Sequence, residues 1–275
     1  MEVIEVPEIT YSRPDTFSFY PIGDCHLGSS YCDEDGLKKK LDQIKTEKNA
    51  YIIGMGDYID AILKNDKRFD IGGLADWVKG DNIIELQREK VKKLFLPHSK
   101  RILVMLTGNH EETVHLDKQD DITRNICKDL NVPYGGYSCF IVLRFNRKSP
   151  NCEHGSTRQI VIHAFHGSGA AQQEGARMMR LMRLVNDIEA DIYLMGHLHT
   201  ITTYAPSRLV YRNGKIKSVP IHAVMTGSWL KAYAQPNKNE SMNASYAERA
   251  GYKPNVLGSP CIKIHPDDGR IWVES

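Results

Sequence analysis

The chain has 275 residues, with 36 lysine and arginine residues against 34 aspartate and glutamate residues, and a formal net charge of +2 at pH 7. A chain of this length can bury a large core as one domain. The near-neutral balance excludes the global basic field that is typical of proteins that bind nucleic acid constitutively, although it is compatible with a local basic patch.

The sequence contains no segment that predicts secretion or membrane insertion. Residues 1–7 carry acids and no apolar h-region, and the longest apolar runs are strand-like, far short of the ~18 residues that span a bilayer. The six cysteines are scattered without paired spacing, which is typical of a reduced protein. We therefore expect a cytoplasmic protein with no membrane partner, while nothing indicates its oligomeric state.

The opening of the chain has the pattern strand, helix, strand. Residues 16–22 alternate like a strand, and Leu37, Leu41 and Ile44 recur at helical spacing. Residues 51–60 then begin with an apolar, partly β-branched run that predicts a buried strand. This order is typical of two parallel strands joined by a right-handed crossover.

The next part of the chain predicts helices followed by a further strand. Residues 61–100 are predicted to be mostly helical, with a start signal at Asn82 and Glu85 and a stop at Pro97. Residues 101–106 form an apolar run that predicts a third buried strand. A short helix is expected around residues 122–130.

Two more strands and a long helix are expected in the second half of the chain. Residues 137–145 and 159–165 predict strands joined by a polar loop, and residues 178–188 carry an apolar helical face. Residues 191–195 predict a fifth buried strand.

The last third of the chain predicts antiparallel strands. Asn213-Gly214 and Asp268-Gly269 are hairpin turn signals between apolar runs. Residues 235–260 form a long polar loop, and a loop of that length in a compact domain is usually functional or becomes ordered on binding.

Five of the strand-like runs end in metal-ligand or acid-base side chains. These residues are Asp24, His26, Asp57, Asn109, His110, His166, His197 and His199. Because sites in open α/β sheets form beyond the carboxyl ends of the strands, we expect these side chains to converge. Carboxylate, imidazole and amide groups together suit borderline divalent metals such as Mn, Fe, Zn or Ni.

A single member of this set carries little information, because a lone buried histidine is usually part of the core and a lone Gly-Asp pair is usually a turn. The joint pattern predicts a metal site. The spacing of Asp24 and His26, and of His197 and His199, places each pair on one face of an extended segment. Such pairs suit two ligands of one site or one ligand for each of two neighbouring metals.

Five motifs, taken in order, resemble the motif series of the calcineurin-like metallophosphoesterases. They are Gly-Asp-Cys-His-Leu-Gly, Gly-Asp-Tyr-Ile-Asp, Gly-Asn-His-Glu, His-Gly and Gly-His-Leu-His, over residues 23–199. The resemblance implies an α/β fold, a four-layer α/β/β/α sandwich of two mixed sheets flanked by helices. It implies a single domain over residues 1–275, with a helical insert around 61–100 and a polar loop around 235–260.

The resemblance also implies a binuclear metal centre, with manganese favoured, and a role for each matched residue. The first metal would be held by Asp24, His26 and His199, and the second by Asn109, His166 and His197. Asp57 would bridge the two metals.

Two further residues have implied roles in catalysis. His110 would protonate the leaving oxygen or stabilise its charge. Asp60 matches the position that often hydrogen-bonds this histidine, and it is equally well placed to be the N-cap of a helix.

Three residues near His166 have competing interpretations. His163 lies three positions earlier on the same strand and so points to the opposite face, which indicates packing, although it competes with His166 for the ligand role. Arg177 and Arg180 follow in the helix, where they line the phosphate site or belong to its solvated face.

The implied activity is two-metal hydrolysis of a phosphoester, monoester or diester, by a water that the metals activate. The protein phosphatase branch has Arg-Gly where this chain has Ala61-Ile62, which weakens a phosphoprotein substrate. Asp-x-His-Leu-Gly is shared with UDP-diacylglucosamine hydrolases and with double-strand-break repair exonucleases, and His110 after Asn109 fits the exonucleases and general phosphodiesterases better.

We expect a small-molecule or nucleotide substrate. A DNA exonuclease or endonuclease is the alternative, and it is not favoured because the net charge is near neutral and no second, DNA-clamping domain follows. A non-catalytic scaffold on the same fold is the second alternative, and it predicts lost ligands, whereas every ligand position is filled here.

Overall fold

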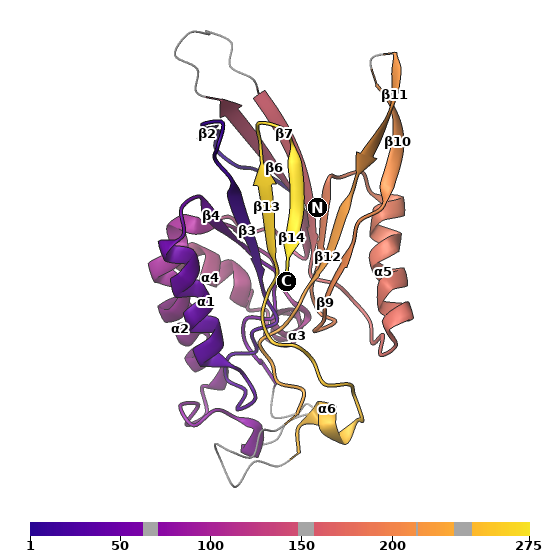
Figure 1. Ribbon diagram of the computed structural model, residues 1–275. Coiled ribbons are helices and arrows are strands. Elements are labelled where there is room, and N and C mark those ends of the chain that lie inside the picture. The colour runs from indigo at the N-terminus through magenta and orange to yellow at the C-terminus, as the bar shows by residue number, and fades with distance from the viewer. Residues whose placement is uncertain (63–70, 148–156, 213, 234–243) are drawn as a thin grey trace.

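Two mixed β-sheets form the centre of the protein, and the computed structural model describes residues 1–62, 71–147, 157–212, 214–233 and 244–275 (Figure 1). The first sheet has seven strands: β1 (Glu2–Glu5), β2 (Ile9–Tyr11), β6 (Ser138–Arg147), β7 (Thr157–Phe165), β8 (Ile192–Met195), β9 (Ile201–Tyr204) and β12 (His222–Thr226). Their order is β1-β6-β7-β8-β12-β9, with β2 paired to β6.

The second sheet has five strands: β3 (Phe17–Ile22), β4 (Ala50–Gly54), β5 (Ile102–Met105), β13 (Cys261–His265) and β14 (Arg270–Glu274). Their order is β14-β13-β3-β4-β5. The pairs β3–β4 and β4–β5 are parallel, which confirms the predicted strand-helix-strand opening. A separate hairpin is formed by β10 (Ser207–Arg212) and β11 (Lys215–Pro220).

The helices of the described residues are α1 (Glu34–Thr46), α2 (Ile83–Phe95), α3 (Asn109–Lys118), α4 (Ile122–Leu130), α5 (Glu174–Asp187) and α6 (Tyr246–Arg249). Two 3-10 turns, η1 (Ile71–Gly73) and η2 (Leu96–Arg101), flank the α2 region.

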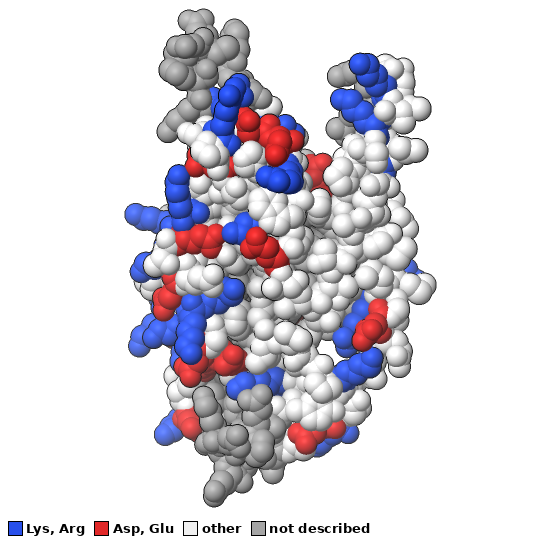
Figure 2. All heavy atoms as spheres, viewed as in Figure 1, with Lys and Arg blue, Asp and Glu red and all other residues white. Residues whose placement is uncertain are grey.

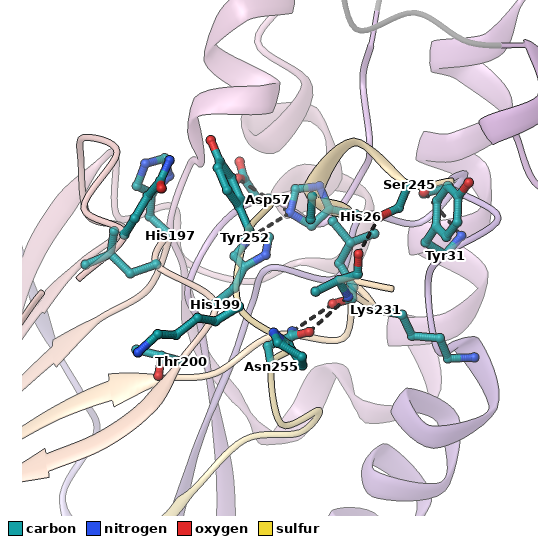
Figure 3. Close-up of a pocket in the computed structure, with 18 of the residues that line it drawn as sticks. His26, Tyr31, Asp57, His197, His199, Thr200, Lys231, Ser245, Tyr252 and Asn255 are labelled. Carbon is teal, nitrogen blue, oxygen red and sulfur yellow. Dashed lines mark hydrogen bonds and ion pairs between the residues drawn. The ribbon is translucent and has the colours of Figure 1, made fainter. Parts of the chain in front are cut away.

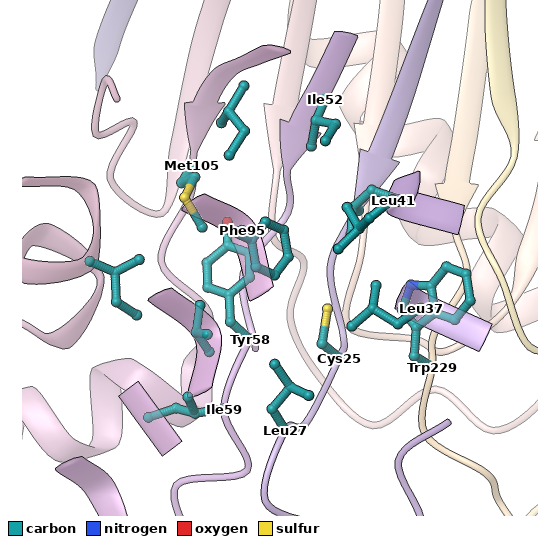
Figure 4. Close-up of a cluster of buried hydrophobic side chains, with 14 of the residues drawn as sticks. Cys25, Leu27, Leu37, Leu41, Ile52, Tyr58, Ile59, Phe95, Met105 and Trp229 are labelled. Atoms are coloured by element: carbon teal, nitrogen blue, oxygen red, sulfur yellow. The ribbon is translucent and has the colours of Figure 1, made fainter. Parts of the chain in front are cut away.

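Helices α1 and α2 cover the outer face of the second sheet. Leu37 and Leu41 of α1 and Phe95 of α2 are fully buried there against Ile52 of β4 (Figure 4). Leu37 and Leu41 are four residues apart and therefore lie on the same face of α1, which packs against the sheet.

The inner faces of the two sheets pack against each other, and α5 closes the opposite side. Phe19 of the second sheet lies in one buried cluster with Ile162 of the first. On the outer face of the first sheet, Leu181 of α5 packs with Tyr193 and Met225. The protein is therefore an α/β/β/α sandwich with two mixed sheets, as predicted.

The structure corrects three details of the predicted elements. The stretch 61–100 is less helical than predicted, because residues 74–82 lie outside the helices and α2 begins at Ile83. The last third is not all antiparallel, because β12 pairs in parallel with β8. Strands β1 and β2 were not anticipated, since each is too short to show a clear apolar run.

Parts of three predicted segments lie outside the described residues. They are residues 63–70 of the stretch predicted to be mostly helical, residues 148–156 of the loop between the two predicted strands, and residues 234–243, most of which belong to the predicted polar loop. The remainder of that polar loop contains α6 and leads into β13. Within the described chain, every helix is too short or too polar to cross a bilayer.

Candidate metal centre

The side chains at the five predicted strand ends meet at one place, although their strands belong to two different sheets. β3, β4 and β5 of the second sheet and β7 and β8 of the first deliver them. The site lies where the carboxyl ends of both sheets approach each other.

The first group of ligand atoms is contributed by Asp24, His26 and His199. Their donor atoms all lie within 4.8 Å of one another. His199 Nε2 is 3.3 Å from Asp24 Oδ1 and 3.2 Å from His26 Nε2. The loops after β3 and β8 thus bring together three residues that are up to 175 positions apart in the chain, from Asp24 to His199 (199 − 24).

The second group contains His166 and Asn109. His166 Nε2 lies 3.0 Å from Asn109 Oδ1 and 3.4 Å from Asp57 Oδ2. Asp57, His166 and His197 also offer donor atoms within 4.8 Å of one another. His197 additionally contacts the Gly169 carbonyl through Nε2 at 3.1 Å.

Asp57 lies between the two groups. Its Oδ2 is 3.9 Å from His26 Nε2 on one side and 3.4 Å from His166 Nε2 on the other. Its backbone carbonyl accepts from the N–H groups of Cys25 and His26, at 2.8 and 3.0 Å. Asp57 therefore connects the β3 and β4 loops and faces both ligand groups.

The backbone at most of the candidate ligands is strained. Five of these residues have positive φ values, from 47° to 68°: Asp24, His26, Asp57, His197 and His199. Residues other than glycine rarely adopt this left-handed conformation, and such strain is concentrated at functional sites. The strained backbone turns the side chains inward at the point where each strand ends.

The site is buried, so its ionisable side chains strongly shift one another's pKa values. Burial by itself raises the pKa of Asp57, but the neighbouring His166 and His110 lower it well below its usual range. Burial lowers the pKa of His166, but the Asp57 carboxylate outweighs burial and raises it to about 10. In contrast, burial lowers the pKa values of His26 and His197, which favours the neutral form of these two imidazoles.

The donor set fits a divalent metal. Two carboxylates, several imidazoles and an amide oxygen converge without a thiolate, a combination that suits borderline metals. Asp24, His26, Asp57 and His166 are at most 2% exposed. Two buried carboxylates beside one another are unfavourable unless positive charge is supplied between them.

The orientation of the His166 ring is fixed by a hydrogen bond on its other nitrogen, since His166 Nδ1 donates to the Met55 carbonyl at 2.7 Å.

The two predicted catalytic residues lie beside the first group. His110 Nδ1 contacts the backbone carbonyl of Asp60, so Asp60 fixes this ring through its main chain. The Asp60 carboxylate is 3.6 Å from His26 Nδ1. His26, Asp60 and His110 also form a cluster of donor atoms within 4.8 Å. If Asp60 were an N-cap, its helix would continue into residues 63–70, which lie outside the described residues.

His163 is on the opposite face of β7, as predicted. Its ring lies 5.2 Å from the Phe140 ring and 6.4 Å from the Tyr193 ring, under α5. Neither of its ring nitrogens has a hydrogen-bond partner among the described residues. His166, and not His163, is the histidine that β7 places in the candidate metal centre.

Arg177 and Arg180 hold the loop that follows His166. Arg177 Nε donates to the Ala171 carbonyl at 2.9 Å, and an Arg180 guanidinium N–H donates to the Ser168 carbonyl at 3.0 Å. Arg177 also lines the pocket over the metal residues. Both arginines therefore stabilise the loop that follows His166.

The sequence analysis missed Glu111. Its buried carboxylate accepts from four backbone N–H groups, those of Asp57, Tyr58, Ile59 and Gly108. Burial and the nearby Asp57 charge raise the pKa of Glu111 to about 7. The signal was present in the motif Gly-Asn-His-Glu, whose last residue is this glutamate.

Comparison with known proteins adds a family match. A family model for calcineurin-like phosphoesterases matches residues 17–200. No curated protein matches the chain.

Several solved structures resemble the chain at low identity. A conserved uncharacterized protein of Streptococcus pneumoniae TIGR4, described as a predicted phosphoesterase, is 13% identical with a TM-score of 0.36, covering 94% of this chain and 88% of that one. Zinc-bound Vps29 of Entamoeba histolytica is 13% identical with a TM-score of 0.32, covering 94% and 97%. GAP50, the anchor in the inner membrane complex of Plasmodium, is 13% identical with a TM-score of 0.44, covering 94% and 83%.

Proposed function

The chain belongs to the calcineurin-like phosphoesterase family, and on this basis we propose that it hydrolyses a phosphoester with the help of two divalent metals. The observation that carries the proposal is the position of Asp57. Its Oδ2 lies 3.9 Å from His26 Nε2 and 3.4 Å from His166 Nε2, between two groups of ligand atoms. A carboxylate in this position suits a bridge between neighbouring metals.

In this proposal Asp24, His26 and His199 hold one metal, and Asn109, His166 and His197 hold the other. When bound, such a metal pair polarises a phosphoryl oxygen and lowers the pKa of a water to near neutrality. We favour manganese among Mn, Fe, Zn and Ni, since all suit this mixture of oxygen and imidazole ligands.

His110 is the proposed proton donor. A carbonyl can only accept, so the contact with the Asp60 carbonyl assigns a proton to His110 Nδ1. Proton transfer to the leaving oxygen is then the task of Nε2. Asp60 acts by fixing the ring, and its carboxylate next to His26 orients that ligand as well.

The alternatives receive less support. Figure 2 shows basic and acidic side chains interspersed on the visible face, without the continuous basic stripe that a nuclease needs. A non-catalytic scaffold would not require seven ligand residues to be kept together. We also propose a reducing, cytoplasmic setting, which agrees with the free and buried state of the five described cysteines.

The test is the substitution Asp57→Asn. We expect it to lower the metal content, measured by mass spectrometry of the purified protein, and to abolish hydrolysis of bis(p-nitrophenyl) phosphate with Mn²⁺. The matched control is Asp187→Asn, at the exposed last residue of α5, which should change neither quantity. Full activity of the Asp57→Asn protein would overturn the two-metal proposal.

A further inference from the structure

A pocket of about 810 Å³ lies over the candidate metal centre (Figure 3). Asp57, Asn109 and His199 are among its lining residues. Pockets of about 300–1,000 Å³ commonly hold whole drug-sized ligands, and a phosphate group fills only a small part of such a volume. The pocket therefore has room for the organic group that a phosphoester carries.

One side of this pocket is the C-terminal wall, which consists of residues 230–233 and 245–256. The side chain of Asn255 holds the two parts of the wall together. The Ala232 N–H donates to Asn255 Oδ1 at 2.9 Å, and Asn255 Nδ2 donates to the Leu230 carbonyl at 2.8 Å. One amide thus replaces two backbone hydrogen bonds between segments that are distant in the chain.

The wall is also attached to the metal centre. The Trp229 N–H and the Ser228 hydroxyl both donate to the Asp24 carbonyl at 3.0 Å. The Leu230 N–H in turn donates to the Ser228 hydroxyl at 3.0 Å. These bonds fix the start of the wall relative to a metal ligand, so a bound organic group has a defined distance from the reacting phosphorus.

The chemistry of the lining favours a flat, partly apolar group. Tyr31 and Tyr252 both line the pocket, Tyr252 beside the labelled metal ligands and Tyr31 near Ser245 (Figure 3). Nucleic-acid bases stack on aromatic side chains largely irrespective of base identity. Four basic residues line the pocket: Arg177, Lys231, Arg249 and Lys253. Lys253 is paired with Glu174 at 3.2 Å, so this positive charge is partly compensated. What remains suits the phosphate of a single nucleotide.

From these observations we propose that the substrate is a phosphoester of a nucleoside and that the C-terminal wall binds the nucleoside. This inference rests on the proposed phosphoesterase activity. In the reaction, the oxygen of water bonds to phosphorus, the bond from phosphorus to the ester oxygen breaks, and that oxygen takes up a proton. The wall holds the nucleoside while this exchange takes place at the phosphorus.

The experiment compares two diesters with the same leaving group, the p-nitrophenyl ester of thymidine 5′-monophosphate and methyl p-nitrophenyl phosphate. We expect kcat/KM with Mn²⁺ to be at least about tenfold higher for the thymidine ester, the order of magnitude that one stacked base contributes. Tyr252→Ala and Asn255→Ala should reduce this ratio about tenfold. Tyr211→Ala, at an exposed tyrosine of the β10–β11 hairpin, is the matched control and should keep the ratio.

A second measurement is independent of turnover. Thymidine 5′-monophosphate should bind the full-length chain in isothermal titration calorimetry, and Tyr252→Ala should weaken this binding about tenfold. Equal kcat/KM for the two esters, or unchanged ratios in both wall variants, would refute the nucleoside assignment. If the protein prefers single-stranded DNA to the thymidine ester, the nucleoside assignment is wrong and the protein is a nuclease. If the wild type hydrolyses neither of these diesters nor the monoester p-nitrophenyl phosphate, the phosphoesterase proposal itself is refuted.

Discussion

The backbone N–H of Asp57 donates to the carboxylate of Glu111 at 3.0 Å, so the residue that faces both ligand groups is held by an acid outside the ligand set. The same carboxylate oxygen accepts from the Gly108 N–H, and the other oxygen accepts from Tyr58 and Ile59. Glu111 therefore joins the loop after β4 to the start of α3.

Glu111→Ala should destabilise the metal-free protein by at least about 3 kcal/mol, because it leaves several buried N–H groups without an acceptor. Glu111→Gln should also destabilise it, since in either orientation the amide nitrogen faces two N–H donors. Urea unfolding gives both values. The control is Glu112→Gln at the exposed neighbour, and a Glu111→Gln protein as stable as this control would contradict the role of Glu111.

The two histidines of β7 should respond in opposite ways to substitution. His166→Ala should lower the metal content, because His166 Nε2 lies against Asn109 and Asp57. His163→Phe should keep the metals and leave stability equal or higher, because it removes two buried ring nitrogens that have no partner among the described residues. Metal analysis and thermal unfolding of both variant proteins test these expectations. Metal loss confined to the His163 variant would reverse the assignment.

Metal binding should release a proton from His166. In the metal-free protein the Asp57 carboxylate overcomes burial and raises the pKa of His166 to about 10, above the ~6.5 of a free histidine. The imidazole is thus protonated at neutral pH and must lose its proton to bind a metal, so apparent affinity should rise about tenfold per pH unit up to pH ~10. Calorimetric titration with Mn²⁺ in buffers of different ionisation enthalpy measures the released protons. Binding that is independent of pH between 6 and 9 would rule out this coupling.

Gly108→Ala should disrupt the centre through a steric clash. A Cβ at this position would overlap the Asp57 side-chain oxygen and its backbone nitrogen. We expect a loss of about 1–3 kcal/mol in unfolding free energy together with reduced metal content. Gly175→Ala in α5 is the matched control, because a Cβ added there would meet open space, and it should raise stability by up to about 1 kcal/mol.

His110→Ala should separate catalysis from metal binding. We expect the metal content to stay at the wild-type level while the hydrolysis rate falls about 10²- to 10⁴-fold, the usual contribution of a positioned general acid. His115→Ala, at an exposed position of the same helix, should leave the rate unchanged. An unchanged rate in the His110 protein would remove this residue from the mechanism.

The convergence of the candidate ligands was predictable because a similar local pattern occurs at several strand ends. Asp24, Asp57, Asn109 and His197 each follow a glycine that comes after an apolar run. In the structure Asp24, Asp57 and His197 lie in strained loops after their strands, whereas Asn109 is the first residue of α3. The helix faces of α1 and α5 follow from residue spacing in the same way.

Other features depend on contacts between distant segments, which the local sequence does not specify. Glu111 is one acid in the first turn of a helix, where acids are common for reasons of the helix dipole alone. Nothing in its neighbours shows that three backbone N–H groups of another loop will also reach it. Asn255 likewise lies in a polar stretch, and its amide gains a role only when residues 230–232 are placed beside it.

The division of the ligands between two sheets has a mechanical consequence. Strands β3, β4 and β5 carry some of the candidate ligands and β7 and β8 carry the others. Metals bound as proposed would therefore link one sheet to the other at this edge. Separating the sheets here would then require metal–ligand bonds to break, and metal affinity would add to the free energy of unfolding.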